Sequence, residues 1–433
     1  GRAVGIILSG TGTDGTLGVR ALKAHAGIVM AQEPATARFS GMPESAIATG
    51  VVDYVSSTGD LAKILIDYVN FATKTAYEGV PPPDRMENLL KKIFILIRSK
   101  TGQDFSQYKR STILRRIDRR MAIHQILKLE DYVRFLQENP QEISFLSKEL
   151  LIGVTRFFRD PDAWKAFQKL VCDELILSKP RDSTLRVWIV GCSTGEEAYS
   201  MAIVLREALE IQNRLGDTQV QIFATDIDIE AIQIARQGIY PENIAADVSP
   251  ERLKRFFIKE NGTYRIVKEI RETVIFAPQN VISDPPFTHL DILSCRNLLI
   301  YLSPDLQKRL IPLFHFALEP AGILFLGTAE SISGMNALFR TMDGKWKIFQ
   351  RREITPPQAP PIEIHTGFTP AEVGEFRVRR PPIESSITNL AQEWLLQQYA
   401  PPSVIVNENG DILYFHGRTG KYLEPHPGKA ALN

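Results

Sequence analysis

Two adjacent carboxylates, Glu196 and Glu197, stand where a helix is expected to begin, directly after a glycine turn. Residues 185–190 form an apolar, β-branched run, which predicts a buried strand, and the turn runs from Gly191 to Gly195. A glycine turn between a strand and a helix lets backbone N–H groups approach a ligand. Two acids at this point repel a polyanion, so the pattern disfavours a nucleotide phosphate and favours a cation.

A sulfonium methyl donor fits this pattern better than a nucleotide does. S-adenosylmethionine (SAM) carries an ammonium and a sulfonium group and no phosphate. A second expected strand, residues 220–225, ends at Asp226, where doubly wound domains use an acid to bind ribose hydroxyls. Asn280 follows a third strand and either contacts the adenine edge or closes a turn. Arg296 and Asn297 follow a fourth strand, at the rim where such sheets bind ligands.

The helix expected at residues 109–127 carries a dense cluster of positive charge. At 100° per residue its apolar side chains form one stripe and its cations form a separate arc. The cations on this arc are Lys109, Arg110, Arg115, Arg116, Arg119 and Arg120. Such an arc is either a solvated face or a docking surface for an acidic partner, and the number of cations favours docking. The lack of aromatic residues between the arginines disfavours RNA.

The composition is that of a multidomain globular chain. It has 433 residues, 44% hydrophobic content and a formal net charge of +1, and no apolar run approaches the roughly 20 residues that a membrane helix needs. The three cysteines are dispersed, which indicates reduced thiols and a cytoplasmic location. Neither the cysteines nor the seven histidines show metal-ligand spacing, so we expect no metal.

Hydrophobic periodicity and proline content divide the chain into five regions. We expect parallel α/β structure at 1–78, helices at 84–170, a doubly wound α/β domain at 171–352, a Pro-rich linker at 353–385, and a helix followed by a hairpin at 386–433. Within the doubly wound domain a small antiparallel subdomain is expected at about 247–277, where residues 262–267 would pair with residues 273–277.

Four sequence blocks resemble the signature blocks of CheR-type chemotaxis receptor methyltransferases. They are residues 155–159 (TRFFR), 190–200 (VGCSTGEEAYS), 224–228 (ATDID) and 295–301 (CRNLLIY), in the family's order across residues 86–352. The resemblance implies a class I SAM-dependent methyltransferase fold that methylates glutamate side chains on chemoreceptors. The products would be glutamate 5-methyl ester and S-adenosylhomocysteine, and the partner would be the acidic cytoplasmic surface of a receptor.

The same resemblance implies roles for individual residues. The cofactor contacts would be Thr155, Arg159, Gly191, Glu196, Asp226, Asn280, Val281, Arg296 and Asn297. The candidate catalytic residues are Arg159 and Tyr301, and the candidate substrate-docking residues are Arg115, Arg116, Arg119 and Arg120. Gly153 stands where the family often has Asn. A substrate glutamate, with a pKa of about 4.3, is already ionised at neutral pH and needs no general base.

Both ends of the chain resemble parts of other signalling domains. Residues 1–78 resemble the C-terminal end of CheB-type methylesterases through residues 8–15 (LSGTGTDG), 31–33 (AQE) and 41–46 (GMPESA). In that family the aspartate matching Asp14 orients the histidine of a Ser-His-Asp triad whose other members lie upstream. We therefore expect Asp14 to be a turn or N-cap residue and the fragment to lack esterase activity. Residues 386–433 resemble the opening of a PAS sensor domain, as part of a longer signalling chain.

The leading hypothesis is a SAM-dependent protein-glutamate O-methyltransferase. The partial esterase and sensor segments keep a second hypothesis open, a non-catalytic signalling scaffold that binds the cofactor and an acidic partner. A weaker alternative is a nucleic-acid methyltransferase, because residues 284–287 (DPPF) resemble a motif of enzymes that methylate DNA bases. Here the motif precedes the fourth strand, on the opposite edge from the methyl donor. We expect neither nucleic-acid binding nor membrane insertion.

Overall fold

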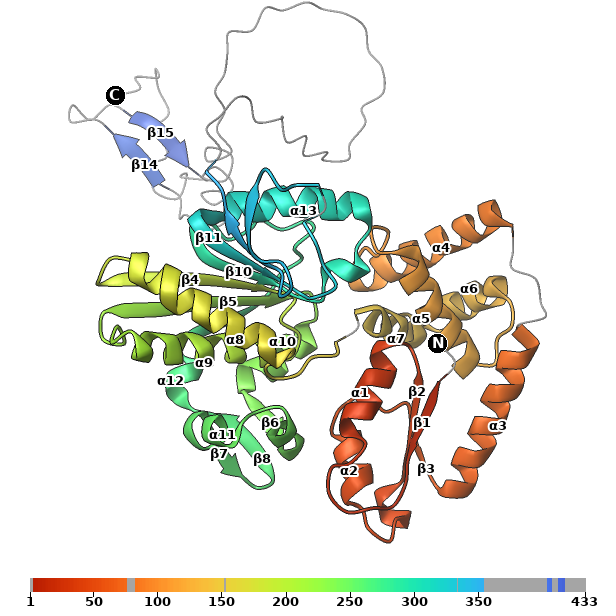
Figure 1. Cartoon of the computed structure of the whole chain (residues 1–433). Helices are drawn as coiled ribbons and strands as arrows, with labels where there is room; N and C mark the ends of the chain where they lie inside the picture. Colours follow the sequence, from red (N-terminus) through yellow and green to blue (C-terminus); the bar gives the residue numbers. More distant parts are fainter. Residues whose placement is uncertain are drawn as a thin grey trace, which may run out of the picture. The chain divides into compact units, whose positions relative to one another are not determined.

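The computed structural model describes residues 3–75, 82–151, 153–332, 334–353, 403–406 and 412–416. The chain divides into two compact units, residues 1–357 and 358–433. The first unit contains an N-terminal α/β segment, a group of helices and a larger α/β domain, which can be followed by colour in Figure 1. Within the described ranges no helix is long and apolar enough to cross a bilayer.

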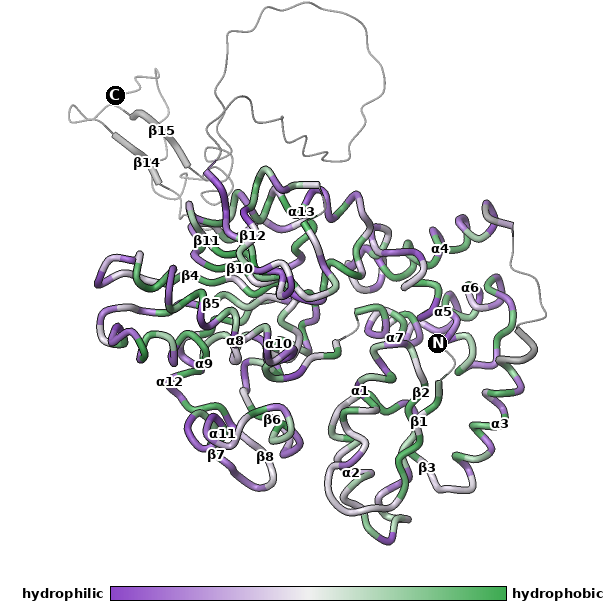
Figure 2. Tube along the Cα trace, viewed as in Figure 1, coloured by the Kyte–Doolittle hydropathy of each residue, from purple (hydrophilic) through white to green (hydrophobic). Residues whose placement is uncertain are grey.

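The N-terminal segment (residues 3–75) has a three-stranded parallel sheet of order β1-β2-β3. Its strands are β1 (Val4–Ile7), β2 (Ile28–Gln32) and β3 (Tyr54–Ser56), and its helices are α1 (Thr16–Ala24), α2 (Gly41–Ile47) and α3 (Thr58–Thr75), with the 3-10 turn η1 (Pro34–Thr36). Every residue of β2 is buried, as its hydrophobic composition predicts (Figure 2). The expected parallel α/β pattern is present, but β3 is too short for its period to show in the sequence.

The helical group packs around one apolar core that includes Ile93, Ile117, Tyr132 and Leu146. Its helices are α4 (Pro83–Thr101), α5 (Arg110–Ile123), α6 (Leu129–Glu138) and α7 (Pro140–Leu151); α8 (Pro161–Leu170) and the π-helical turn η2 (Val171–Ile176) lead into the larger domain. Helix α5 ends before the expected residue 127 because Gln125 is left-handed, with φ at 57°.

The larger domain is built on a seven-stranded sheet of order β12-β13-β11-β10-β4-β5-β9. The strands are β4 (Ser183–Val190), β5 (Thr218–Asp226), β9 (Val274–Pro278), β10 (Leu290–Cys295), β11 (Leu318–Leu326), β12 (Phe339–Asp343) and β13 (Ile348–Arg351). Strands β9, β5, β4, β10 and β11 are parallel, and β13 and β12 form an antiparallel edge. Strand β4 lies between β5 and β10, so the direction of winding reverses there. Ligands bind at this switch point in doubly wound sheets.

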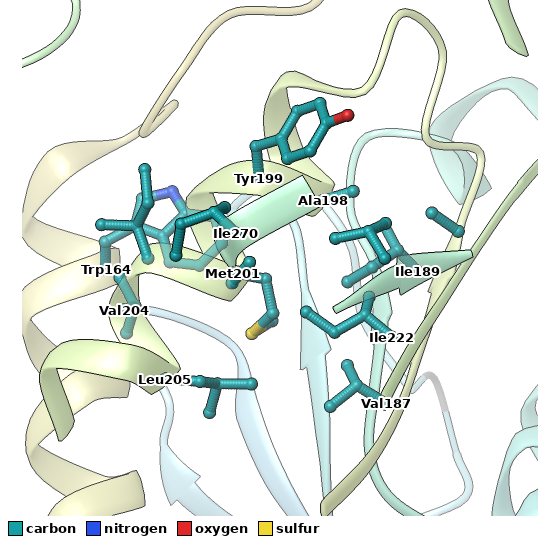
Figure 3. Close-up of a cluster of buried hydrophobic side chains, with 14 of the residues drawn as sticks. Trp164, Val187, Ile189, Ala198, Tyr199, Met201, Val204, Leu205, Ile222 and Ile270 are labelled. Carbon is teal, nitrogen blue, oxygen red and sulfur yellow. The ribbon is translucent and has the colours of Figure 1, made fainter. Parts of the chain in front are cut away.

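Hydrophobic cores lie on both faces of this sheet because side chains alternate along each strand. Val187 and Ile189 of β4 point into one core together with side chains of α8 and α9 (Figure 3), whereas Trp188 packs into the other core with α13. The helices and short turns of this domain are α9 (Glu196–Ile211), α10 (Ile229–Gln237), η4 (Leu299–Tyr301) and α13 (Pro304–Ala317).

The antiparallel subdomain differs from the expected pairing. Its sheet has the order β6-β8-β7, so the expected pairing of residues 262–267 with residues 273–277 is wrong. Residues 274–277 belong to β9 of the main sheet, where they form the third strand, which Asn280 follows. Its elements are β6 (Ile239–Pro241), η3 (Glu242–Ala246), α11 (Pro250–Phe256), β7 (Phe257–Glu260), β8 (Thr263–Ile266) and α12 (Lys268–Arg271). Strand β8 pairs with β7 through an Asn261-Gly262 turn, in which both φ angles are positive. Strand β8 therefore pairs with β7, its neighbour in the hairpin, and not with residues 273–277.

In the second unit the structure describes one hairpin, β14 (Ser403–Val406) and β15 (Ile412–His416), which pair antiparallel as the sequence predicts. The expected Pro-rich linker, beyond residue 353, and the helix expected from residue 386 lie outside the described residues.

Candidate active site

A cleft opens at the carboxyl ends of β4, β5 and β10, at the switch point of the sheet. It is lined by Tyr108, Leu150, Leu151, Gly153, Val154, Thr155, Arg159, Val190, Gly191, Ser193, Glu197, Thr225, Asp226, Ile227, Asp228, Gln279, Asn280, Val281, Ile282, Arg296, Asn297, Leu298, Tyr301 and Leu302. The structure thus brings together every expected cofactor contact except Glu196, and it adds Tyr301, the second candidate catalytic residue. The lining residues come from segments almost two hundred positions apart in the chain.

Asp226 organises the glycine turn as well as the cleft. Its Oδ2 accepts the backbone N–H of Ser193 at 2.7 Å and its Oδ1 accepts that of Asp228 at 2.9 Å. Gly191 has a φ of 73°, and its N–H donates to the carbonyl of Thr225 at 2.8 Å, which ties the turn to the end of β5. Asp226 can therefore accept hydrogen bonds from a ligand with its remaining lone pairs while its position stays fixed.

The surroundings of Asp226 raise its pKa above the usual aspartate value. Burial is the main cause, and the backbone N–H groups of Asp228 and Ser193 partly oppose it. The hydroxyl of Tyr108 is affected in turn, because burial and the charge of Asp226 raise the pKa of Tyr108 to about 12. A cationic ligand would relieve the cost of burying this carboxylate.

Only one of the two acids at the start of α9 lines the cleft. The carboxylate of Glu197 accepts the Ser294 hydroxyl at 2.7 Å and lies 3.6 Å from a nitrogen of Arg296. Burial raises the pKa of Glu197, and the charge of Arg296 opposes that rise. Glu196 instead accepts the Thr194 hydroxyl at 2.6 Å and is not among the lining residues. Consecutive helical residues point about 100° apart, which is consistent with Glu197 lining the cleft while Glu196 does not.

Arg296 holds two walls of the cleft together. Its side chain is fully buried, and its guanidinium lies 5.3 Å from the ring centroid of Trp164 and 4.6 Å from that of Phe325. One nitrogen donates to the carbonyl of Arg159 at 2.9 Å and to the carboxylate of Asp160 at 3.0 Å. Arg296 therefore fixes the segment that carries Arg159 against the end of β10.

The adjacent Asn297 is held in a left-handed conformation with a φ of 61°. Its N–H donates to Glu330 at 2.9 Å, and the same carboxylate accepts the N–H groups of Gly327 at 2.7 Å and Ile300 at 3.3 Å. A side chain at Gly327 would place its Cβ 2.9 Å from the Asn297 nitrogen, so only glycine fits there. Glu330 is a positioning residue that no sequence motif indicated.

Tyr108 is a second residue that the sequence motifs did not indicate. It precedes α5, in the helical group, and reaches the cleft because its backbone forms an antiparallel bridge with Leu302. Lys109 donates its N–H to the carbonyl of Tyr301 at 2.8 Å beside this bridge. No local pattern signals a contact between segments almost two hundred residues apart.

Asn280 lines the cleft and also closes a turn. Its Oδ1 accepts the N–H of Ile282 at 3.0 Å, and its own N–H donates to Asp284 at 2.8 Å. Asp284 belongs to the DPPF motif, and Phe287 of the same motif stacks on Phe223 with 4.4 Å between ring centroids. Both residues therefore have structural roles in the loop that follows β9. The motif was expected on the opposite edge of the sheet from the methyl donor, but Asp284 and Pro285 contact Asn280 and Gln279, which line the cleft.

Unpartnered polar atoms in the cleft define the ligand that would fit. Ser193 Oγ, Gln279 Oε1 and Asn297 Oδ1 are buried without a hydrogen-bond partner. Buried acceptors of this kind are rare without a ligand or water. Together with the carboxylates of Asp226 and Glu197 they suit a cationic ligand that is rich in hydroxyl and ammonium donors. A phosphate would face two carboxylates, so these acceptors fit SAM, and Arg159 and Arg296 of the same cleft suit the carboxylate that SAM also carries.

The arginines of α5 do not form the single exposed face that the helical period suggested. Arg116 and Arg119 are only 3% and 4% exposed. Arg120 donates to Glu142 at 2.8 Å and lies 3.2 Å from His124, whereas Arg115 is exposed. The acidic residues that pair with these arginines lie on other elements, so the sequence could not predict which arginines would be paired and buried. A substrate-docking role for the four arginines stays a prediction.

Asp14 lies in an exposed turn before α1. The N-cap of α1 is Gly15, with a φ of 85° and no side-chain cap, so the turn interpretation of Asp14 holds and the N-cap interpretation does not. The three cysteines, Cys172, Cys192 and Cys295, are buried and unpaired. Among the described ranges no three His, Cys, Asp or Glu side chains are grouped to hold a metal.

The fold and the cleft define a class I SAM-dependent methyltransferase, and comparison with known families agrees. The family described as CheR methyltransferase, SAM binding domain, matches residues 153–348, and CheR methyltransferase, all-alpha domain, matches residues 88–151. CheB methylesterase matches residues 1–65. The chain belongs to the CheR methyltransferase family, and its cofactor is S-adenosylmethionine. The resemblance of residues 386–433 to a PAS sensor domain stays a prediction.

Relatives cover different parts of the chain. The putative methyltransferase Cher3 of Pseudomonas putida is 32% identical over 58% of this chain and 92% of that protein. Chemotaxis protein methyltransferase 2 of Pseudomonas aeruginosa is 32% identical over 56% of this chain and 86% of that protein. An uncharacterized 104.1 kDa protein of Rhodobacter capsulatus is 36% identical over the whole chain, which spans 47% of that relative.

Proposed function

We propose that this chain methylates glutamate side chains on the cytoplasmic part of chemoreceptors, with SAM as the methyl donor. The products are glutamate 5-methyl ester and S-adenosylhomocysteine. The observation that carries the proposal is the cleft at the switch point, where Asp226, Glu197 and Asn297 present acceptors to a cationic ligand. Relatives named chemotaxis protein methyltransferase support a protein of chemotaxis as the methyl acceptor, and the glutamate side chain and the cytoplasmic location are what the resemblance to the CheR family implies.

The residues that would hold SAM divide by chemistry. Asp226 suits the ribose hydroxyls, because its carboxylate is fixed at the end of β5. Glu197 and the unpartnered oxygen of Asn297 suit the ammonium group. Val281 and the rest of the loop after β9 provide an apolar wall for the adenine. When bound, SAM supplies an electrophilic methyl group on its sulfonium.

The substrate glutamate would enter as a carboxylate, which is already the nucleophile at neutral pH. No side chain must remove a proton, so the contribution of the protein is to orient the carboxylate and exclude water. Arg159 and Tyr301 line the cleft and are suited to orient a carboxylate, the arginine as a cation and the tyrosine as a hydroxyl donor. Orientation of this kind can lower a barrier by roughly 7–11 kcal/mol.

The test is transfer of labelled methyl groups from SAM to a purified cytoplasmic fragment of a chemoreceptor. We expect the transferred label to be released by mild alkali, because a carboxyl methyl ester hydrolyses there and a methylated amine does not. At a SAM concentration below the wild-type Kd, Asp226→Asn should reduce the transfer about 10- to 100-fold. Asp305→Asn, the same change at an exposed position on α13, should leave the transfer unchanged. Label that resists alkali would contradict methylation of a carboxylate, and SAM binding without any transfer would favour a non-catalytic scaffold.

A further inference from the structure

The N-terminal segment covers the arginine pair of α5, Arg116 and Arg119. We propose that this segment and an acidic protein substrate compete for that pair, so that residues 3–75 mask a docking surface of the transferase within the same chain. The proposal rests on the function proposed above, because it assumes that the substrate is an acidic protein.

The first set of contacts joins Arg116 to the end of α1. Its Nη1 donates to the carbonyl of Lys23 at 3.2 Å and its Nη2 donates to the carbonyl of Ala24 at 3.3 Å. The last carbonyls of a helix have no partner within the helix and carry partial negative charge. The guanidinium therefore caps α1, and the N-terminal segment satisfies Arg116 without using a carboxylate.

The second set is an ion-pair cluster with an excess of cations. Asp53 of the N-terminal segment contacts Arg119 and lies 2.8 Å from Lys23. Glu149 of α7 lies 3.1 Å from Arg116, 2.5 Å from Arg119 and 3.3 Å from Lys23. Three cations thus share two carboxylates, and all five side chains are at most 17% exposed. Lys23 and Asp53 both belong to the masking segment, so these two side chains bring no net negative charge to the arginines, and a partner with several acidic side chains could neutralise them more fully.

The third contact is apolar. Ala122 of α5 is buried in the same cluster as Ile28, Met30 and Leu61, which belong to the N-terminal segment. The covered surface therefore combines an apolar centre with charged groups, as protein interfaces do. Arg115 lies on the same helix but is exposed, and it is described with only a backbone contact, to the carbonyl of Ser111 at 3.3 Å. It provides an internal reference for accessibility.

The mask also reaches the wall of the cleft. Glu149, which Lys23 contacts, directly precedes Leu150 and Leu151, and both of these line the cleft. Release of the N-terminal segment would free this end of α7 as well as the arginine pair. A substrate docked on α5 would then lie beside the segment that leads into the cleft.

The first measurement is the rate at which phenylglyoxal modifies each arginine in the whole chain, read by mass spectrometry. In the wild type, Arg116 and Arg119 should react at least about tenfold more slowly than Arg115, because reaction requires the mask to open. Asp53→Asn and Lys23→Gln, two independent changes on the masking side, should speed their modification. Asp60→Asn changes an exposed acid of α3 and should leave it unchanged. Equal modification rates at all three arginines in the wild type would contradict the proposal that the N-terminal segment covers Arg116 and Arg119.

The second measurement is calorimetric binding of a chemoreceptor cytoplasmic fragment in the presence of S-adenosylhomocysteine. Asp53→Asn and Lys23→Gln should bind the fragment about tenfold more tightly than the wild type, because apparent affinity scales with the competent fraction. Unchanged affinity despite faster modification of the arginines would refute competition. A fragment that binds neither the wild type nor the variants contradicts the proposed function, and the modification rates still show whether the pair is covered.

Discussion

Replacement of Glu149 by glutamine should loosen α5 and α7 although it changes neither the size nor the shape of the side chain. Burial alone would raise the pKa of Glu149, but Arg119, Lys23 and Arg116 together lower it to about 2. The carboxylate is thus stabilised by the three cations more than it is penalised by burial. Glu149→Gln removes that charge and leaves the cations with a single carboxylate, Asp53.

The size of the effect follows from the pKa. A decrease from the ordinary value of 4.5 to about 2 corresponds to about 3 kcal/mol, at 1.36 kcal/mol per pKa unit. Because the pKa in the folded protein is the lower one, this stabilisation is complete above pH 4.5. It is lost as the pH falls through 4.5 toward 2, and by linkage roughly half of it remains at pH 3.

Hydrogen exchange read by mass spectrometry reports this change locally. At pH 7, amides of α5 and α7 should exchange roughly a hundredfold faster in Glu149→Gln than in the wild type. At pH 3 the ratio should fall to about tenfold. Glu138→Gln, the same change at an exposed position of α6, is the matched control. Exchange within threefold of the wild type at pH 7, or a ratio that does not depend on pH, would refute the reasoning.

Further predictions concern the cleft. Asp226→Asn should weaken SAM binding about 10- to 100-fold, because it removes a charged acceptor, and an unchanged Kd by calorimetry would exclude the residue from the site. Since burial raises the pKa values of Asp226 and Glu197, SAM affinity should fall as the pH drops from 7 toward those values, with proton release that calorimetry in two buffers detects. Tyr108→Phe should raise the Kd for SAM about 2- to 10-fold without shifting the unfolding midpoint; a shifted midpoint at constant Kd would indicate a structural role. Glu330→Gln should destabilise the turn at Asn297 by about 1–3 kcal/mol and weaken SAM binding, which scanning calorimetry and titration measure together.

Most of the cleft could be predicted from the sequence because its residues follow buried strands. Asp226 ends β5, and Arg296 and Asn297 follow β10, so the ends of apolar runs indicated residues that meet at one edge of a parallel sheet. The choice between Glu196 and Glu197 could not be made in this way. It depends on the rotation of α9 about its axis, which packing against the sheet decides.

The sequence did not predict the cleft residues that lie outside the motifs. Glu330 supports Asn297 through backbone N–H groups, and Tyr108 reaches the cleft from the helical group. Neither lies in a motif, because each acts on a segment that is distant along the chain. The expected pairing of the antiparallel subdomain was wrong for a similar reason, since β7 and β9 both lie close to β8 in the chain and local sequence does not decide which of them pairs with it.

Helix α5 shows most clearly what the sequence determines and what only the tertiary structure determines. The sequence alone determined that the cations of α5 lie on one arc, because the helical period depends only on local backbone geometry. Only the tertiary structure decided that Arg116 and Arg119 are buried beside Asp53 and Glu149 while Arg115 stays exposed. Ion pairs between distant elements depend on how those elements pack, and no spacing within the helix contains that information.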